Sequence, residues 1–409
     1  MDDITLAELI ELRRDLHQHP EVRFAEHRTA KVLAAQLAGL GFTVTEGVGG
    51  TGVLATMDSG LAGPHVMLRA DMDALPTTDI KAVAYASQTP GIAHACGHDV
   101  HCAVVMGAAR LLVRDDALAG GGRLTILYQP AEEIPFGETS GAAAVLETGL
   151  LQAEPPSAVF GIHCWPHLPS GTIGLDERTA MASKLAFKVS VRGKGAHAAT
   201  PQLGADALLG ASQIVVALHT VASRELDPSD RVAMNVGTIA SGSSQSIVAA
   251  NAELSGTVRT VRKDVGERLK ASIERVSTGV AAAYGLTAVV DWKNEMPAVL
   301  NDPSLVDRAR EVIGWSEDVE AVTMIADPPM TADDFALYAE RWPSLYMKLG
   351  VARPGARAWP SLHDGAFDVD EACIRTGAIA MARVAADALA GAPTAHSADR
   401  DAAHARSTR

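Results

Sequence analysis

The N-terminal third of the chain combines amphipathic helical patterns with short apolar runs. Leu6, Leu9, Leu12 and Leu16 recur at spacings of three and four residues, which predicts one face of a helix that Pro20 ends. Further helices are predicted at residues 25–40 and 100–113, and buried strands at residues 65–68, 124–128 and 158–162. This alternation of strand and helix indicates an α/β fold with a mostly parallel central sheet covered on both faces.

The pattern changes at residue 183, where strand-like runs and two long amphipathic helices follow in a new order. Strands are predicted at residues 185–191, 232–239, 252–258 and 286–292, and helices at residues 205–221 and 264–284. The order βαββαβ is that of a small ferredoxin-like α+β sandwich. The simplest organisation is therefore a catalytic domain in two segments, with this second domain inserted between them.

A chain of 409 residues exceeds the usual size of a single core, so two domains are expected. The predicted division is a first catalytic segment at 1–182, the inserted domain at 183–293, a second catalytic segment at 294–392 and a tail at 393–409. The tail is Ala, His, Ser, Asp and Arg without periodicity, which indicates disorder.

Composition and charge argue against several classes of partner. A net charge of −14 opposes nucleic-acid binding, because phosphate groups require a basic surface. We find no N-terminal signal pattern, and no apolar run near ~18 residues that would span a bilayer. The four cysteines are too few and too scattered for a disulfide framework. We therefore expect a cytoplasmic protein that binds neither nucleic acid nor membrane.

Six residues in four separate runs carry the candidate chemistry. Cys96 and His98 lie in the run 94–101, which also holds His94 and His101. The other four are Glu132, Glu133, His163 and His363. Thiolate, imidazole and carboxylate together are the ligands that bind zinc and its first-row neighbours. Since a carboxylate beside the ligands can carry protons for a metal hydrolase, the pattern predicts a metal-dependent hydrolase.

Each of these motifs also has an ordinary structural alternative. A lone histidine is most often a buried or surface residue, but Cys-Gly-His with two further histidines favours a metal site. Glu132 and Glu133 would be solvated charge on a surface, yet they follow an apolar strand and a proline. Because neighbouring carboxylates cannot both face one atom, one is expected to bind metal and the other to act as general base.

Two further motifs bear on the site. Asp71 and Asp73 follow the strand at 65–68, where a carboxylate could orient a ligand histidine or could simply pair with Arg69. His197 ends a glycine-rich loop that lacks the spacing of a phosphate-binding loop, so nucleotide binding is not expected. The chain also has no Gly-x-Ser-x-Gly nucleophile motif.

Taken together, the motifs resemble those of the M20 peptidases, and most closely the amidohydrolase subfamily that includes hippurate and auxin-conjugate hydrolases. The matching segments run in the family's order and cover nearly the whole chain except the tail. They are residues 13–21, 69–76, 94–99, 129–133, 161–163, 223–225, 256–260 and 362–363. The resemblance implies hydrolysis of the amide bond in an N-acyl amino acid or a related small conjugate.

The resemblance also implies roles for single residues. Two divalent ions, of zinc, manganese, cobalt or nickel, would be held by five ligands with the Cys96 sulfur between them. The implied ligands are Cys96, His98, Glu133, His163 and His363. Glu132 would be the general base and acid, and Asp71 is also counted among the catalytic residues. The inserted domain would be a lid that also forms a homodimer or larger homo-oligomer. From it His197 would reach the substrate's carbonyl oxygen, and Arg259 would pair with its free carboxylate.

The chain departs from the family's pattern in the lid. Ser246 stands where an asparagine that helps to position the substrate is usual, which leaves the substrate preference open. Asp333 and Asp334 replace a Glu-Asp pair, and Cys164 stands where an aliphatic residue is more common. None of these changes touches an expected ligand or Glu132.

Three alternatives stay open. The first is a metallo-carboxypeptidase or dipeptidase acting on short peptides. The second is a cysteine hydrolase with Cys96 as nucleophile, although Cys96 and His98 are too close along the chain for a normal nucleophile–base pair. The third is a non-catalytic metal-binding or small-molecule-binding protein on the same fold. One metal ion instead of two is also compatible with the sequence.

Overall fold

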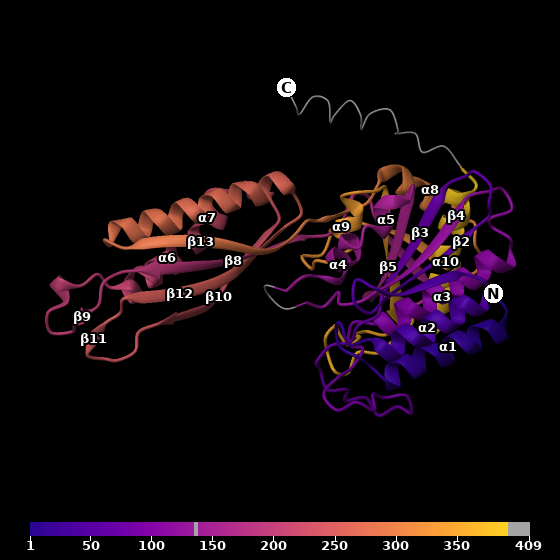
Figure 1. Cartoon of the computed structure of the whole chain (residues 1–409), viewed down its shortest axis with the longest axis horizontal. Helices are drawn as coiled ribbons and strands as arrows, with labels where there is room; N and C mark the ends of the chain where they lie inside the picture. The colour runs from indigo at the N-terminus through magenta and orange to yellow at the C-terminus, as the bar shows by residue number, and fades with distance from the viewer. Residues whose placement is uncertain (135–137, 392–409) are drawn as a thin grey trace, which may run out of the picture.

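A computed structural model describes residues 1–134 and 138–391 of the chain. The described residues form a rounded lobe around an eight-stranded sheet and a narrow lobe around a four-stranded sheet (Figure 1). The predicted disordered tail at 393–409 lies outside the described residues.

The central sheet of the rounded lobe is mixed, and most of its neighbouring strands are parallel. From one edge to the other it consists of β1 (Thr43–Val48), β2 (Gly52–Asp58), β4 (Arg123–Gln129), β3 (His65–Asp71), β5 (Ala158–Pro169), β16 (Ser344–Ala352), β6 (Thr172–Asp176) and β15 (Ala321–Ile325). The pairs β3–β4, β3–β5, β5–β16 and β6–β15 are parallel, and the other three are antiparallel. The predicted α/β class with a mostly parallel sheet is confirmed.

Alternate side chains of the central strands enter two different cores. In β3, Val66 and Leu68 face one core, and Met67 faces the other. The first core includes α1 (Asp3–Gln18), α2 (His27–Gly39), α3 (His98–Arg114), α8 (Pro303–Gly314) and α10 (Cys373–Leu389). The second includes α4 (Gly141–Glu147), α5 (Leu150–Ala153) and α9 (Ala336–Ala339). Helices therefore cover both faces of the sheet, as a parallel sheet requires.

The narrow lobe has the βαββαβ order expected from the sequence. Its antiparallel sheet runs β10 (Val232–Ser241), β12 (Asn251–Thr260), β8 (Ser183–Arg192) and β13 (Thr287–Met296). On one face, α6 (Ala207–Arg224) and α7 (Lys263–Ala283) cover a core of its own (Figure 1). In chain order, β8 is the first of these strands and β13 is the last. They lie near residues 183 and 293, the predicted limits of the inserted domain, which stay a prediction.

Two short ladders complete the described topology. β9 (Ala196–His197) pairs with β11 (Ile247–Val248) at the end of the narrow lobe farthest from the rounded one, with a 3₁₀ turn at Pro201–Leu203 (Figure 1). β7 (Thr179–Met181) pairs with β14 (Val299–Leu300) where the chain passes between the lobes. Both connections between the lobes are thus held in one ladder.

Helix α6 is the one described helix with the length and hydropathy of a membrane span, which the search for apolar runs in the sequence did not anticipate. Its inner residues Ala211, Ile214 and Leu218 are fully buried against the four-stranded sheet. This one-sided burial is what the core helix of a two-layer lobe shows.

Candidate metal centre and active site

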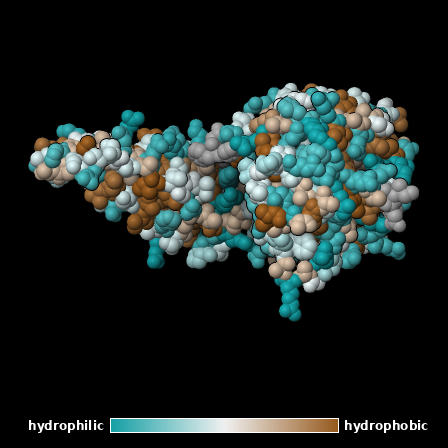
Figure 2. All heavy atoms as spheres, turned by 90° about the horizontal axis from the view of Figure 1, so that it is seen from below, coloured by the Kyte–Doolittle hydropathy of each residue, from teal (hydrophilic) through white to brown (hydrophobic). Residues whose placement is uncertain are grey.

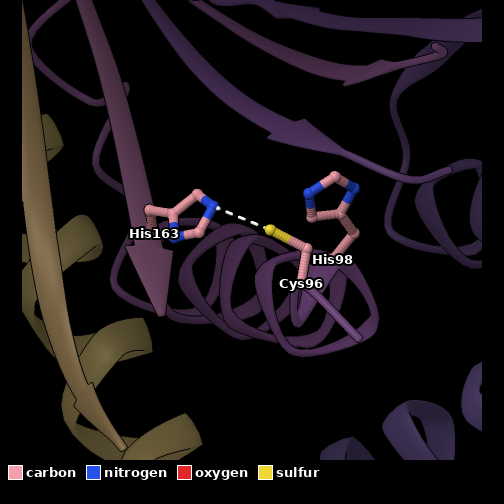
Figure 3. A group of neighbouring side chains, drawn as sticks. All are labelled: Cys96, His98 and His163. Carbon is pink, nitrogen blue, oxygen red and sulfur yellow. Dashed lines mark hydrogen bonds between the residues drawn. The ribbon is translucent and has the colours of Figure 1, made fainter. Parts of the chain in front are cut away.

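Cys96 and His98 flank the glycine at which α3 begins. Gly97 caps the helix with a left-handed backbone, φ +85°, and a Cβ at this position would lie 2.7 Å from the Cys164 Sγ. Glycine is therefore required both for the turn and for the close approach. The turn brings the Cys96 thiol and the His98 ring into one buried site at the start of the helix (Figure 3).

His163 projects toward Cys96 from β5 (Figure 3). Its Nε2 lies 3.5 Å from the Cys96 Sγ, and its Nδ1 lies 2.8 Å from the backbone oxygen of Cys164. Because that oxygen accepts a hydrogen bond, the proton is assigned to Nδ1, and Nε2 keeps its lone pair. Burial, with the neighbouring His101, lowers the pKa of His163 to about 4. A neutral ring with a free Nε2 is the form of histidine that binds a metal ion.

His98 is oriented by Asp73. The Asp73 Oδ1 lies 3.2 Å from the His98 Nδ1. The opposite ring nitrogen of His98, Nε2, is buried and has no hydrogen-bond partner among the described residues. Buried polar atoms in native proteins are nearly always partnered, so this nitrogen fits a site that a metal ion fills.

Asp71 makes its short contacts with a different histidine and with Arg69, and its Oδ2 also lies 3.8 Å from the His98 Nε2. Its Oδ1 lies 2.5 Å from the His101 Nδ1, and its Oδ2 lies 2.7 Å from the Arg69 guanidinium. The His101 Nε2 accepts a hydrogen bond from the Cys164 backbone N–H at 2.8 Å, so both nitrogens of that ring are engaged. Both roles considered for the motif therefore occur, with the ion pair at Asp71 and the contact to a candidate ligand at Asp73.

Glu132 and Glu133 lie on a turn that two buried carboxylates hold. The Asp73 carboxylate accepts hydrogen bonds from the backbone N–H groups of Glu132 and Glu133, each at 3.0 Å. Glu26 accepts one from the N–H of Ala131, whose backbone is left-handed with φ +48°. Such a backbone is uncommon for a residue other than glycine and persists where its surroundings impose it.

His363 reaches the site from the loop between β16 and α10. Its backbone N–H donates to the Ala95 oxygen at 2.8 Å, next to Cys96, and its φ is +68°. The His363 Nε2 lies 2.9 Å from a Glu133 carboxylate oxygen. A strained backbone held by a neighbouring segment is typical of functional positions.

The five expected ligands form two overlapping sets. In each set, one candidate ligand atom per residue lies within 4.8 Å of the others. The sets are Cys96, His98 and His163, and Cys96, Glu133 and His363. Sulfur, nitrogen and oxygen atoms in this combination suit zinc and neighbouring divalent ions, so the residues present fit a divalent metal centre.

Carboxylates dominate the electrostatics of the protein without metal. Burial raises the pKa of Glu132 well above its ordinary value, and Asp333, Glu133 and Asp334 raise it further. Burial and the Glu133 carboxylate likewise raise the pKa of the Cys96 thiol. A bound cation acts in the opposite direction on both groups. A thiol that stays protonated is not an activated nucleophile, which argues against a cysteine hydrolase.

A cavity of about 390 Å³ opens beside the candidate ligands, and Figure 2 shows a hollow with hydrophilic side chains where the two lobes join. Its polar lining includes Glu132, Lys184 and Arg259. Its apolar lining consists of Ile134, Trp165, Met181, Met296, Ala332 and Leu362. Of the residues expected to bind substrate, Arg259 is therefore placed in the wall of the cavity.

Two other expected residues lie elsewhere. His197 is in β9 and Ser246 directly precedes β11, and both are exposed at the far end of the narrow lobe (Figure 1). The His197 Nδ1 accepts a hydrogen bond from the Ala199 backbone at 3.0 Å, and neither residue lines the cavity. Within a single chain, His197 and Ser246 are not brought to the candidate ligands.

Sequence reasoning missed a buried polar network beside the cavity. The Arg69 guanidinium donates to Asp334 at 2.8 Å and to the Gln129 oxygen at 2.9 Å, and Gln129 donates to Asp334 at 2.9 Å. The Tyr346 hydroxyl donates to Asp333. The signal available in the sequence was the acidic pair Asp333 and Asp334 directly before the aromatic Phe335. Buried acids need hydrogen-bond donors, so a buried acidic pair indicates a polar network around it.

Comparison with known proteins agrees with this geometry. Residues 67–387 match the family described as Peptidase family M20/M25/M40. The N-acetyl-L-cysteine deacetylase of Bacillus subtilis (strain 168) is 38% identical over 370 residues, which cover 90% of this chain and 85% of that protein. Thermostable carboxypeptidase 2 of Saccharolobus solfataricus is 33% identical over 379 residues, which cover 92% and 94%.

A solved structure is similar over nearly the whole chain. It is a dinuclear metal-binding peptidase of family M20 from Bacillus subtilis, with a TM-score of 0.81 and 32% identity, covering 95% of this chain and 99% of that one. The chain belongs to peptidase family M20/M25/M40, and it is a metal-dependent hydrolase of amide bonds.

Proposed function

We propose that this protein hydrolyses the amide bond of N-acyl amino acids or related small conjugates, with Glu132 as general base and acid. The observation that carries the proposal is the turn at Glu132 and Glu133. Both glutamates line the cavity; Glu133 shares a candidate ligand set with Cys96 and His363, and Glu132 lies within reach of His98 and Glu133 with its backbone held by Asp73. A base fixed beside metal ligands is the arrangement that metal-assisted hydrolysis needs.

Each residue of the site then has a defined task. Divalent ions bound by the ligand sets supply Lewis acidity to a carbonyl and to water. Glu132 accepts a proton from the attacking water at a carboxylate oxygen and delivers it to the nitrogen of the departing amine. Arg259 pairs with the free carboxylate of the amino-acid part, and the apolar lining contacts the acyl group. Asp71 acts indirectly, by positioning His101 and Arg69.

We also propose that two ions bind, of zinc, manganese, cobalt or nickel, with Cys96 as the shared ligand. The overlap of the two ligand sets at Cys96 supports this, as does the similarity to a dinuclear peptidase. A soft thiolate with imidazole and carboxylate suits these metals better than magnesium or calcium.

The assembly is proposed to be a homodimer or larger homo-oligomer formed through the narrow lobe, in the cytoplasm. The edge strands β10 and β13 leave unpaired backbone groups that a second chain can meet. His197 and Ser246 would contact the substrate from that second chain. The cysteines are all free and buried, which fits a reducing compartment.

The test of the reaction is release of free amino acid from a panel of N-acyl amino acids. The protein is stripped of metal and restored with one metal at a time, with Glu132→Gln in parallel. We expect metal-restored turnover that falls by about 10²–10⁴ in Glu132→Gln while the metal content stays the same. Full activity of the variant would disprove the role of Glu132, and turnover that resists chelation would disprove the metal dependence.

A carboxypeptidase or dipeptidase activity is the second candidate. The relative from Saccharolobus solfataricus carries that name, and the last residue of a peptide presents to Arg259 the same free carboxylate. Dipeptides with free and with acylated amino termini belong in the same panel. Faster hydrolysis of the free dipeptides would favour this candidate, and metal binding without any turnover would favour a non-catalytic binding protein.

A further inference from the structure

Two basic side chains stand next to each other in the wall of the cavity. Lys184 of β8 and Arg259 of β12 are direct cross-strand partners. Their chain neighbours Leu185 and Val258 point into the core under α6 and α7. Because side chains alternate along a strand, Lys184 and Arg259 leave the sheet from the opposite face, and both line the cavity.

Neither cation forms an ion pair with a carboxylate of residues 1–134 and 138–391. Arg259 donates to the backbone oxygen of Met330 at 3.0 Å, and Lys184 forms no ion pair with the described part of the chain. Both side chains are half-buried. Burial lowers the pKa of Lys184, and the adjacent Arg259 lowers it further, as two like charges do.

A lysine four residues further along the same strand shows the ordinary arrangement. Lys188 leaves β8 on the same face as Lys184 and pairs with Glu253 of β12 at 2.5 Å, outside the cavity. The strand therefore supplies an acidic partner for the lysine at the surface and none for the lysine in the cavity. Glu132 and Glu133 line the same cavity and favour the charged form of Lys184, but neither forms an ion pair with it. Two adjacent, partly desolvated cations without a direct ion pair favour the binding of an anion between them.

We propose that Lys184 and Arg259 together form a recognition site for two carboxylates, so that the enzyme prefers N-acyl amino acids with a second carboxylate. This inference rests on the proposed function and deepens it. Arg259 holds one carboxylate through its planar fork, and the Lys184 ammonium pairs with the other. The second carboxylate belongs either to an acidic amino acid or to a dicarboxylic acyl group, and the chemistry recognised is the same.

A structural role for Lys184 predicts a different result. As a mere counter-charge to Glu132 and Glu133, it would affect the binding of all substrates alike. As a recognition residue, it changes the ratio between charged and neutral substrates. The ratio is therefore the quantity to measure.

The experiment is calorimetric binding to metal-loaded Glu132→Gln, in which turnover is blocked. N-acetyl-L-glutamate is compared with N-acetyl-L-glutamine. N-succinyl-L-alanine is compared with the analogue in which the free carboxylate of the succinyl group is an amide. These pairs differ in one charge and almost nothing in size. We expect the dicarboxylate of at least one pair to bind about tenfold more tightly, which corresponds to about 1.4 kcal/mol. The pair that shows it identifies the side of the amide bond that carries the second carboxylate.

Variants at two lysines then assign the preference. Adding Lys184→Met should reduce the preference to about twofold or less, while Lys184→Arg, which keeps the charge, should retain it. Lys188→Met on the same strand is the matched control and should also retain it. Equal binding within both pairs, or a preference that survives Lys184→Met, would overturn the inference.

Turnover of the same compounds by the protein with Glu132 intact separates the two proposals. A charge preference in binding without any hydrolysis would contradict the proposed function and leave the carboxylate site standing. Hydrolysis of acidic and neutral compounds at equal rates, with equal binding, would support the proposed function and reject the carboxylate site.

Discussion

At the scale of single residues, one carboxylate holds three parts of the site together. Asp73 accepts hydrogen bonds from the backbone N–H groups of Glu132 and Glu133 and contacts the Nδ1 of His98. Its side chain is fully buried, so water does not substitute for it. The proposed base and two candidate ligands are therefore positioned by the same group.

Asp73→Asn tests this dependence. An asparagine keeps one acceptor oxygen but turns an NH₂ toward a backbone N–H, so one donor of the turn loses its partner. We expect metal affinity to fall about 10–100-fold, with a lower kcat. The measurement is metal content after dialysis against a competing chelator. Asp58→Asn, which loses only an exposed pair with Arg123, is the control; equal metal retention in the two variants would contradict the assignment.

The residues that meet at the site were predictable from the sequence. The individual contacts between them were less predictable. The ligand set followed from chemistry, because thiol, imidazole and carboxylate rarely cluster by chance. The choice between Asp71 and Asp73 did not follow, because it depends on where α3 lies beside the end of β3. The distance of His197 from the ligands was equally hidden, since a position along the chain does not report at which end of its lobe a loop lies.

At the scale of elements, the start of α3 depends on the backbone of Gly97. A side chain there adopts an unfavourable φ of +85° and meets the Cys164 Sγ. Gly91 has a similar φ of +76° but open space around it. The two glycines separate the cost of the backbone conformation from the cost of the contact.

Gly91→Ala should lose about 1–2 kcal/mol of stability from the left-handed backbone alone. Gly97→Ala should lose a further amount of about 1–3 kcal/mol from the contact, and it should also bind metal more weakly because Cys96 and His98 shift. Thermal unfolding and metal content of both variants check this. Metal affinity that is unchanged in Gly97→Ala would show that the turn tolerates displacement without moving the ligands.

Strands with a continuous apolar run or a clear alternation were predictable, but β16, whose apolar run a charged residue interrupts, was not predicted. β12 alternates buried and partly exposed residues, and its predicted range lies within its observed bounds. β16 is buried along almost its whole length, and Lys348 interrupts its apolar run in the sequence. That lysine is tolerated because its ammonium pairs with the buried Asp176 at 2.7 Å, a partner that lies far away in the chain.

The carboxylate of Asp79 stabilises the segment between β3 and α3 through hydrogen bonds. Burial opposes its charge, but hydrogen bonds from His17 and from the backbone N–H groups of Ser87 and Lys81 lower the pKa of Asp79 below its ordinary value. The folded protein therefore binds the proton more weakly than the unfolded chain. The stability from Asp79 is complete above the unfolded pKa of about 4 and is lost as the pH falls below it.

Asp79→Asn should therefore lower stability by about 1–3 kcal/mol at neutral pH, and the difference from the wild type should shrink as the pH falls from 5 toward 2. Thermal midpoints of both proteins across this range provide the measurement. Asp291→Asn, at an exposed position of β13, should follow the wild type at every pH. A difference that stays constant down to pH 2 would mean that Asp79 acts through packing and not through its charge.

At the scale of the whole molecule, the candidate catalytic groups are divided between distant places. Glu132 and the ligand sets lie in the rounded lobe, whereas His197 lies in β9 at the far end of the narrow lobe (Figure 1). The lobes are joined through the ladder of β7 and β14, next to the cavity. Because β9 lies at the end of the narrow lobe farthest from this ladder, a rigid rotation of the lobe about the ladder would keep β9 far from the cavity. A role for His197 in catalysis therefore requires a second chain.

Mixing two inactive variants tests this requirement. Glu132→Gln lacks the base and His197→Ala lacks the lid histidine, so each alone should form dimers with little activity. In a mixed dimer, one site carries both defects and the other carries neither, because a two-fold axis gives each site the rounded lobe of one chain and β9 of its partner. Random exchange should then restore about a quarter of the wild-type activity. The measurement is activity against mixing ratio, with light scattering to establish the dimer. If mixed dimers form and stay inactive, His197 acts within its own chain or has no catalytic role.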